Sequence, residues 1–86
     1  MSKLSEKKIE KIKNDVLFVL FENNLKPLYT KHIADELARD DEFVLRLLKG
    51  LEKNNLIKQV NKKDLRRKRW VIGDEAYKKY KELLPV

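Results

Sequence analysis

The chain lacks cysteine altogether, and it has only two glycine and two proline residues among its 86. The absence of cysteine excludes disulfide bonds and thiolate metal sites, and it is typical of proteins of a reducing cytosol. Because glycine and proline are so few, little of the chain is predicted to be loop. A chain of this length buries only a small core, so no deep substrate cavity is expected.

Long apolar segments are missing as well. The longest uninterrupted apolar run is VLFVLF, residues 16–21, which is far too short to cross a membrane. The first residues, MSKLSEKKIEKIK, alternate charge with apolar positions where a signal peptide would have its apolar core. The sequence therefore predicts a cytoplasmic protein.

Groups for catalysis and metal binding are scarce. The chain has a single histidine, and no pair of nucleophile and base is recognisable. His32 lies at helical spacing from Asp35 and Glu36, but without a second imidazole or a thiolate this is a poor transition-metal site. We expect no enzymatic activity, no metal and no cofactor.

Positive charge is abundant and concentrated. The net charge is +7, and residues 57–70 alone hold seven basic residues and one acidic residue. A concentrated basic patch indicates a polyanionic partner more strongly than dispersed charge does. The alternative is a solvated hairpin tip whose charges only prevent pairing at the edge of a sheet.

Apolar periodicity predicts a first helix over residues 5–23. Its apolar residues recur at spacings of three and four and cover more than one side, so the helix either runs through the domain or meets a second subunit. Two short helices follow, with Thr30 and Asp40 as predicted N-caps, and together they form a helix-turn-helix. The Asn pairs at 23–24 and 54–55 predict left-handed helix ends, each followed by a leucine that folds back.

Extended structure is predicted for LIKQV (56–60) and KRWVI (68–72), which form a hairpin with the basic stretch at its tip. We expect Trp70 and Ile72 to face the core and Arg69 to point away. A last helix follows Gly73, with Asp74 as its cap. The predicted fold is mainly α with a small β-hairpin, in the order helix, short extended segment PLY (27–29), helix, helix, hairpin and C-terminal helix, and residues 1–86 form a single domain.

These residues resemble a known fold family. IADELARDDEFVLRLLKGLEKNNLIKQV, followed by DLRRKRWVIGDEAYKKY, resembles the winged helix-turn-helix domain of the MarR/ArsR-type transcriptional regulators. Asp64 and Arg66 match the Asp-x-Arg of the family's basic hairpin. The resemblance covers residues 27 to about 80. It implies a homodimer that binds double-stranded DNA, with the recognition helix in the major groove, the wing at the backbone or minor groove, and the outer helices in the dimer interface.

The candidate sites follow from this reading. The wing would contact DNA through Lys62, Lys63, Arg66, Arg67, Lys68 and Arg69. The helix-turn-helix would contact DNA through Thr30, Lys31, Arg46 and Lys49, although a helix cap and ordinary surface charge explain these four residues almost as well. The dimer interface would comprise Ile9, Ile12, Val16, Phe18, Phe21, Tyr77, Tyr80 and Leu84.

One feature favours a different function. The predicted recognition helix begins with Asp40, Asp41 and Glu42, which repel phosphates, and it places Leu45 and Leu47 where polar side chains would read bases. A winged helix that assembles with another protein is therefore the main alternative, and a basic RNA-binding module is a second one. The sequence does not identify any small-molecule effector.

Overall fold

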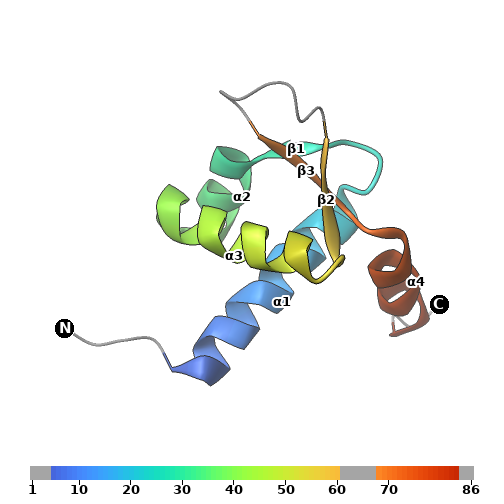
Figure 1. Ribbon diagram of the computed structural model, residues 1–86, viewed down its shortest axis with the longest axis horizontal. Helices are drawn as coiled ribbons and strands as arrows, with labels where there is room; N and C mark the ends of the chain where they lie inside the picture. The colour runs from blue at the N-terminus through green and yellow to red at the C-terminus, as the bar shows by residue number, and fades with distance from the viewer. Residues whose placement is uncertain (1–4, 61–67, 84–86) are drawn as a thin grey trace.

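The computed structural model of the chain describes residues 5–60 and 68–83, and the elements in those ranges follow the order expected of a winged helix (Figure 1). The fold is mainly helical with a small antiparallel sheet, as predicted. In chain order the elements are α1 (Glu6–Glu22), β1 (Leu28–Tyr29), α2 (Thr30–Leu37), α3 (Asp41–Lys53), β2 (Ile57–Val60), β3 (Arg69–Ile72) and α4 (Asp74–Leu83).

The sheet has the strand order β1-β3-β2, and β3 is antiparallel to both neighbours. Trp70 lies opposite Leu28 on one side and opposite Gln59 on the other. Along β3, Trp70 and Ile72 are buried whereas Arg69 is only partly covered, so the predicted alternation is confirmed. The hairpin thereby inserts its tryptophan into the body of the protein.

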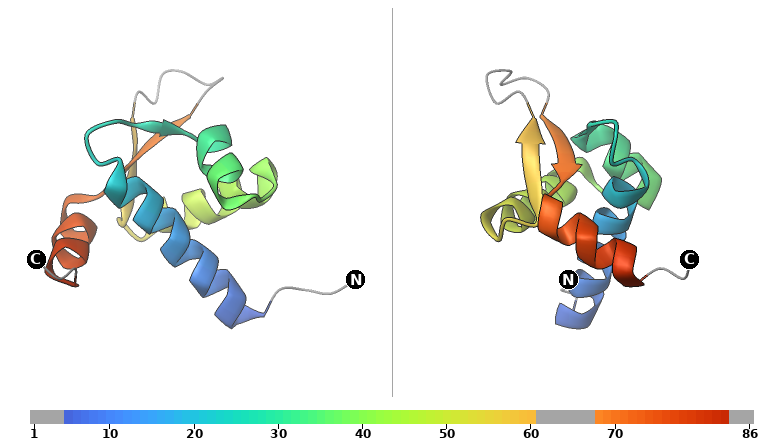
Figure 2. Two further views of the ribbon diagram at one scale, coloured as in Figure 1. Left: turned by 180° about the vertical axis from the view of Figure 1, so that it is seen from behind. Right: turned by 90° about the vertical axis from the view of Figure 1, so that its right-hand side faces the viewer.

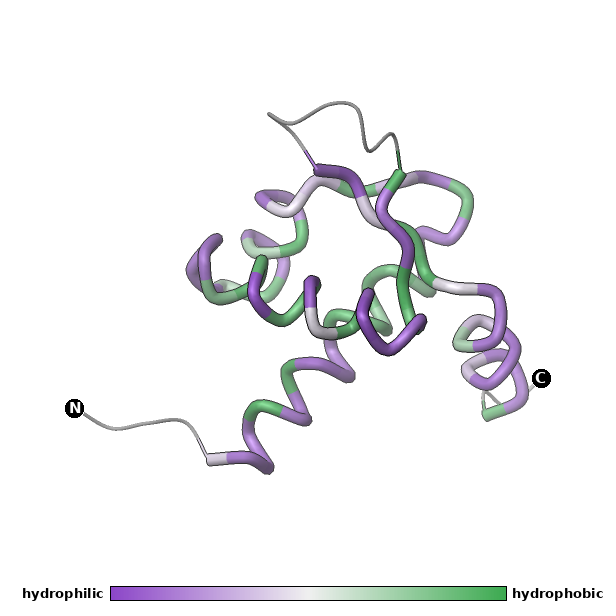
Figure 3. The backbone as a smooth tube through the Cα atoms, in the orientation of Figure 1, coloured by the Kyte–Doolittle hydropathy of each residue, from purple (hydrophilic) through white to green (hydrophobic). Residues whose placement is uncertain are grey.

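The core lies where α1 passes the helix-turn-helix and the sheet. Figure 1 shows α2 and α3 on one side of the hairpin and α4 on the other, and Figure 2 shows the first half of α1 extending away from them. Apolar residues gather toward the centre, as the colours of Figure 3 show. The fully buried side chains include Val16, Leu20, Ile33, Val44, Leu48, Ile57 and Trp70. The first helix was predicted either to run through the domain or to meet a second subunit. Its C-terminal half runs through the domain, because Val16 and Leu20 are fully buried there.

The end of α3 follows the prediction from its Asn pair. Asn55 adopts a left-handed conformation with φ 62°, and its N–H donates to the Glu52 carbonyl at 2.9 Å. The N–H of Leu56 donates to the Leu51 carbonyl at 3.0 Å, while the Leu56 side chain packs against the core. This end fixes the direction in which the chain leaves α3 and enters β2.

The end of α1 differs from the prediction. Asn23 has φ −112°, and neither it nor Asn24 is left-handed. Instead, the side-chain amides of Asn23 and Asn24 donate to the carbonyls of Val19 and Phe21 at 2.8 and 2.9 Å. The Val19 carbonyl also accepts the backbone N–H of Asn23 at 3.2 Å, whereas the Phe21 carbonyl lies in the last turn, where the helix itself supplies no donor. The side chains thus complete the end of α1 without a left-handed turn. The following Leu25 does not fold back and is 95% exposed.

The turn between α2 and α3 was not predicted in its details. Ala38 adopts a left-handed conformation with φ 53°, and the N–H of Arg39 donates to the Ala34 carbonyl at 2.9 Å. A left-handed alanine is unfavourable by about 1–2 kcal/mol, so neither composition nor propensity indicates it. Packing of α2 and α3 against the same core holds this turn in place.

Gly73 connects β3 to α4, and its small size is required by the fold. Its N–H donates to the Leu56 carbonyl at 2.8 Å, and a Cβ at this position would lie 3.0 Å from the carbonyl oxygens of both Asn55 and Leu56. Asp74 then begins α4, but its carboxylate pairs with Lys58 Nζ at 3.4 Å, and it lies inside the helix instead of preceding it as the predicted cap. The chain therefore passes from β3 to α4 at Gly73, where the backbone of Asn55 and Leu56 leaves no space for a side chain.

Candidate nucleic-acid interface

The helix α3 is divided cleanly between a buried and an exposed face. Val44, Leu47, Leu48 and Leu51 are buried at helical spacing, which directs the opposite face to solvent. That face carries Glu42, Arg46, Lys49 and Lys53, all of them exposed. We call Arg46, Lys49 and Lys53 the basic stripe of α3.

The basic stripe is not neutralised by the described parts of the chain. The ion pairs among the described residues join Lys11 to Asp15, Lys13 to Glu10 and Lys58 to Asp74, and none involves α3. The charges of the stripe are therefore available to an external polyanion. Lys53 was not among the predicted contacts, although its spacing of four from Lys49 places it on the same face.

The first turn of α3 is acidic, as its sequence indicated. The carboxylate of Asp40 accepts a hydrogen bond from the Phe43 N–H at 3.4 Å, so Asp40 is the N-cap that was predicted. Asp41 and Glu42 follow in the first turn and are exposed. Acids at this end interact favourably with the helix dipole, which gives them a structural role independent of any partner.

The leucines of α3 do not form an exposed surface. Leu47 is 8% exposed and belongs to the core, and Leu45 is partly buried against it. Phe43 is partly covered as well. The observation that favoured a leucine-rich docking face on α3 is thus explained by packing inside the chain.

At the start of α2, Thr30 has a different role from the one predicted. The residue in the N-cap position is Tyr29, whose side chain makes no capping bond, and Thr30 is the first residue of the helix. The hydroxyl of Thr30 accepts a hydrogen bond from the indole Nε1 of Trp70 at 2.9 Å. Thr30 is therefore not the cap, because it is already part of the helix, and its oxygen bonds instead to a residue forty positions away.

This contact joins the base of the wing to the helix-turn-helix. The backbone N–H of Thr30 also donates to the carbonyl of Lys68 at 3.3 Å, and the Arg69 guanidinium lies 5.8 Å from the centre of the Tyr29 ring. The side chain of Lys31 is exposed next to these contacts. Three interactions thus connect residues 68–70 to the junction of β1 and α2 at Tyr29 and Thr30, and none of them was predicted from the sequence.

Only part of the predicted wing lies within the described residues. Lys68 and Arg69 are described, and both are partly exposed. Lys62, Lys63, Arg66 and Arg67 lie outside the described residues, as does Asp64. The role of these side chains in binding stays a prediction from the sequence.

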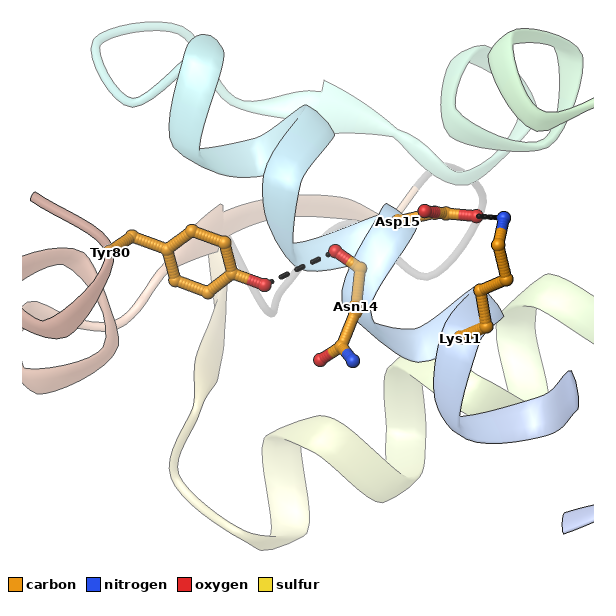
Figure 4. A network of polar contacts seen from close by, with 4 residues as sticks. All are labelled: Lys11, Asn14, Asp15 and Tyr80. Carbon is orange, nitrogen blue, oxygen red and sulfur yellow. Dashed lines mark hydrogen bonds and ion pairs between the residues drawn. The ribbon is translucent and has the colours of Figure 1, made fainter. Parts of the chain in front are cut away.

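The helix α4 docks on α1 through aromatic side chains. The ring of Phe21 lies 5.2 Å from that of Tyr77 and 5.6 Å from that of Tyr80. The hydroxyl of Tyr80 donates to the carbonyl oxygen of Asn14 at 3.2 Å, as Figure 4 shows. Burial, and to a smaller extent the negative charge of Asp15, raises the pKa of Tyr80 above 10.0. Phe21, Tyr77 and Tyr80, which were predicted at the dimer interface, thus pack against one another within one chain.

The other predicted dimer residues have different surroundings. Ile12 and Val16 are 5% and 0% exposed, so they pack inside this chain and offer almost no surface to a second copy. Ile9 is partly exposed, and Phe18 is 42% exposed. Leu84 lies outside the described residues, but Leu83 before it is 79% exposed. Exposed apolar surface therefore remains on both α1 and α4.

Small-molecule and metal sites are poorly developed in the described residues. An open depression of about 550 Å³ lies between α1 and the end of α2, and a second of about 370 Å³ lies over His32, Asp35 and Glu36. Within residues 5–60 and 68–83, no group of three or more His, Cys, Asp or Glu residues is arranged so that it could hold a metal ion. Over the same residues, none of the helices combines the length and the apolar content that a membrane span requires.

Comparison with solved structures identifies the class of fold. A mutant of MepR from a multidrug-resistant S. aureus clinical isolate has a TM-score of 0.73 and 26% sequence identity, covering 88% of this chain and 56% of the MepR chain. The S. aureus MepR–DNA complex has a TM-score of 0.72 at 26% identity, with coverage of 90% and 67%. A mutant of Lactococcus lactis ZitR has a TM-score of 0.70 at 26% identity, with coverage of 94% and 54%.

The chain has the winged-helix fold of the MarR-type regulators, in agreement with the resemblance found in its sequence. It spans between about half and two thirds of the length of these neighbours. No protein-family model and no curated protein sequence matches the chain.

Proposed function

We propose that this chain is one DNA-binding domain of a transcriptional regulator that acts on double-stranded DNA as a homodimer. In this proposal α3 enters the major groove, and the basic wing after β2 contacts the phosphate backbone or the minor groove. Its support comes from a winged-helix fold that is similar to the DNA complex of MepR, together with the charges that this chain adds to that fold.

The observation that carries the proposal is the basic stripe of α3. Arg46, Lys49 and Lys53 project from the exposed face of the helix that this fold presents to DNA, and no described residue neutralises them. An arginine and lysines on such a face can bind phosphates or the O6 and N7 atoms of guanine. A positive surface of this kind suits the phosphate backbone of DNA.

The start of α2 supplies a second group of contacts. Lys31 is exposed there, and Thr30 retains a hydroxyl proton to donate because its oxygen accepts from Trp70. A phosphate at this position would meet the positive end of the helix dipole. We assign Lys31 and Thr30 to backbone positioning, which carries no information about base sequence.

Sequence preference, by contrast, depends on few residues. The exposed acids Asp41 and Glu42 face away from the core at the start of α3, where they repel phosphates and can accept hydrogen bonds only from base amino groups such as that of cytosine. Most of the affinity therefore comes from the wing and the basic stripe, while Arg46 and Lys49 supply the base contacts.

Self-association completes the proposal. Phe18 on α1 and Leu83 on α4 are exposed at 42% and 79%, on the two helices that Phe21 and Tyr80 hold together. An isologous contact of two copies through α1 and α4 would cover these side chains. Two wings and two α3 helices would then face neighbouring turns of one duplex.

The wing is tested by charge removal. One variant replaces the four basic residues nearest the strand, Arg66, Arg67, Lys68 and Arg69, with alanine. Binding of duplex DNA across a salt series should weaken, and the slope of log K against log salt should fall by about 3–4 units, because each lost phosphate contact contributes about 0.9.

The matched control removes the same charge from exposed lysines elsewhere, namely Lys7, Lys8, Lys78 and Lys79. It should change the slope far less, since net charge alone acts weakly at a distance in salt. An affinity and slope equal to those of the unmodified protein in the wing variant would refute the role of the wing. Selection of bound sequences from random duplex DNA tests the regulator directly: a palindrome supports it, and binding without enrichment contradicts sequence-specific regulation.

A further inference from the structure

The two glycines of this chain have opposite surroundings. At Gly73 a Cβ would lie 3.0 Å from two backbone carbonyl oxygens, so the fold itself requires glycine. At Gly50, in the interior of α3, a Cβ would meet no atom within 4 Å. Gly50 also has no positive φ that would favour glycine. Within the described parts of the chain, no contact or backbone geometry explains a glycine at position 50.

A glycine in a helix interior is nevertheless unfavourable. It loses more conformational freedom on folding than any other residue, and alanine in its place raises the equilibrium constant for folding by roughly two- to fivefold. Most of the other residues of α3 are good helix formers, namely leucine, arginine, lysine and glutamate. Because nothing in residues 5–60 and 68–83 calls for a glycine at this position, we look for its role in a contact outside them.

The position of Gly50 on the helix indicates where that requirement acts. It lies four residues after Arg46, directly after Lys49 and three residues before Lys53, so it borders the basic stripe. On one side of this bare backbone lie three cations that make no ion pair with the described residues, and on the other side lie the buried Leu47 and Leu51. This arrangement lets a negatively charged surface approach the helix axis closely at Gly50 while the adjacent cations contact it.

We propose that Gly50 is the point of closest approach between α3 and duplex DNA, where the missing side chain lets the helix seat in the groove. This inference rests on the proposed function. It states that one residue, Gly50, determines how deeply α3 enters the groove of the duplex. Gly50 is a positioning residue: it sets how closely Arg46, Lys49 and Lys53 reach the duplex.

Duplex DNA fits this surface better than a protein partner does. The large exposed apolar residues of the described chain are Phe18, Leu25, Tyr29 and Leu83, and none of them lies on α3. A protein contact that needs a glycine for close packing would also need apolar neighbours to bury, since the core of such an interface is depleted of charge. The exposed neighbours of Gly50 on α3 are instead the cations of the basic stripe, whereas its apolar neighbours Leu47 and Leu51 are already buried in the core.

The test separates stability from binding with Gly50→Ala and Gly50→Leu. Because alanine and leucine favour helices and the site is open, urea denaturation should show both variants at least as stable as the unmodified protein, with about two- to fivefold less unfolding for Gly50→Ala. Gly73→Ala is the matched control, and its Cβ should lower stability because backbone carbonyls cannot move aside.

Binding of random-sequence duplex DNA, followed by fluorescence anisotropy, should move in the opposite direction. Gly50→Ala should weaken binding several-fold and Gly50→Leu by about tenfold or more, because each added carbon separates α3 from the groove. Arg46→Ala serves as a charge control and should lower the salt slope by about one unit.

Equal DNA affinity for the unmodified protein and both Gly50 variants would overturn the inference while leaving the proposed function in place. A change in sedimentation, with DNA affinity unaltered, would assign the glycine to a contact between copies and would overturn it too. If the unmodified protein binds no duplex DNA, the proposed function fails, and duplex DNA is excluded as the occupant of this surface.

Discussion

The hydrogen bond between Trp70 and Thr30 should be a measurable link between the wing and the helix-turn-helix. Trp70 is fully buried, and its indole N–H reaches the Thr30 oxygen at 2.9 Å. Thr30→Val keeps nearly the same shape and helix propensity but removes the acceptor. A buried donor left without a partner costs about 1–3 kcal/mol, and we expect about 1.5 kcal/mol because Thr30 is only half-buried.

The expected loss is large enough to measure reliably. For a domain of this size, about 1.5 kcal/mol corresponds to a decrease in Tm of roughly 6–12 °C. Because Trp70 is the single tryptophan and lies in the core, its fluorescence reports unfolding in urea directly. Circular dichroism at the helix bands provides a second probe, which also serves variants that lack the tryptophan.

A double-mutant cycle isolates the bond itself. Trp70→Phe removes the donor and leaves a small cavity, at an expected cost of about 2–3 kcal/mol. In the Trp70→Phe background, Thr30→Val should cost almost nothing, which gives a coupling energy of about 1 kcal/mol or more. If Thr30→Val costs the same in both backgrounds, the bond does not contribute to stability and the reasoning is refuted.

Two further predictions concern α1 and α4: one tests the exposed apolar face of α1, and the other tests the burial of Tyr80 between the two helices. Phe18→Glu places a charge on the exposed apolar surface, so it should shift the proposed dimer toward the 10.3 kDa monomer in sedimentation at micromolar concentration, while the unfolding midpoint changes little. A dimer that this variant leaves unaltered would exclude this face from the interface. Since burial raises the pKa of Tyr80 above 10.0, its contribution to stability is fully present below the unfolded value and is lost as the pH rises through the folded pKa. Stability above pH 10.0 should therefore fall more steeply in the unmodified protein than in Tyr80→Phe, and parallel pH profiles would contradict the burial of this hydroxyl.

The sequence predicted the elements and much of the core because those depend on local patterns. Helical spacing placed Val44, Leu48 and Leu51 inside, and period-two alternation placed Trp70 and Ile72 inside. The capping residue Asp40 was also readable, since its carboxylate bonds to an N–H three residues away. Each of these predictions was confirmed without reference to any distant residue.

The predictions that were wrong concern residues whose type and spacing fit more than one kind of contact. Two Asn pairs looked alike, but Asn23 and Asn24 bond back to α1 through their side chains, whereas Asn55 adopts the left-handed turn. Thr30 looked like a cap, but its oxygen meets Trp70. Val16 looked like an interface residue, but it is enclosed by the chain's own core. Periodicity predicts which side of a helix is apolar, but it does not predict whether that side packs inside the chain or against a second copy.

By itself the sequence determined the order of elements, the amphipathic division of α3 and the concentration of positive charge in residues 57–70, because spacing and composition act along the chain. Only the tertiary structure decided which hydroxyl holds Trp70, which apolar residues of α1 stay exposed, and which of two glycines the fold requires. The reason is that these properties belong to pairs of residues far apart in the chain. Gly50 and Gly73 are the same residue type, and only their surroundings in space distinguish them.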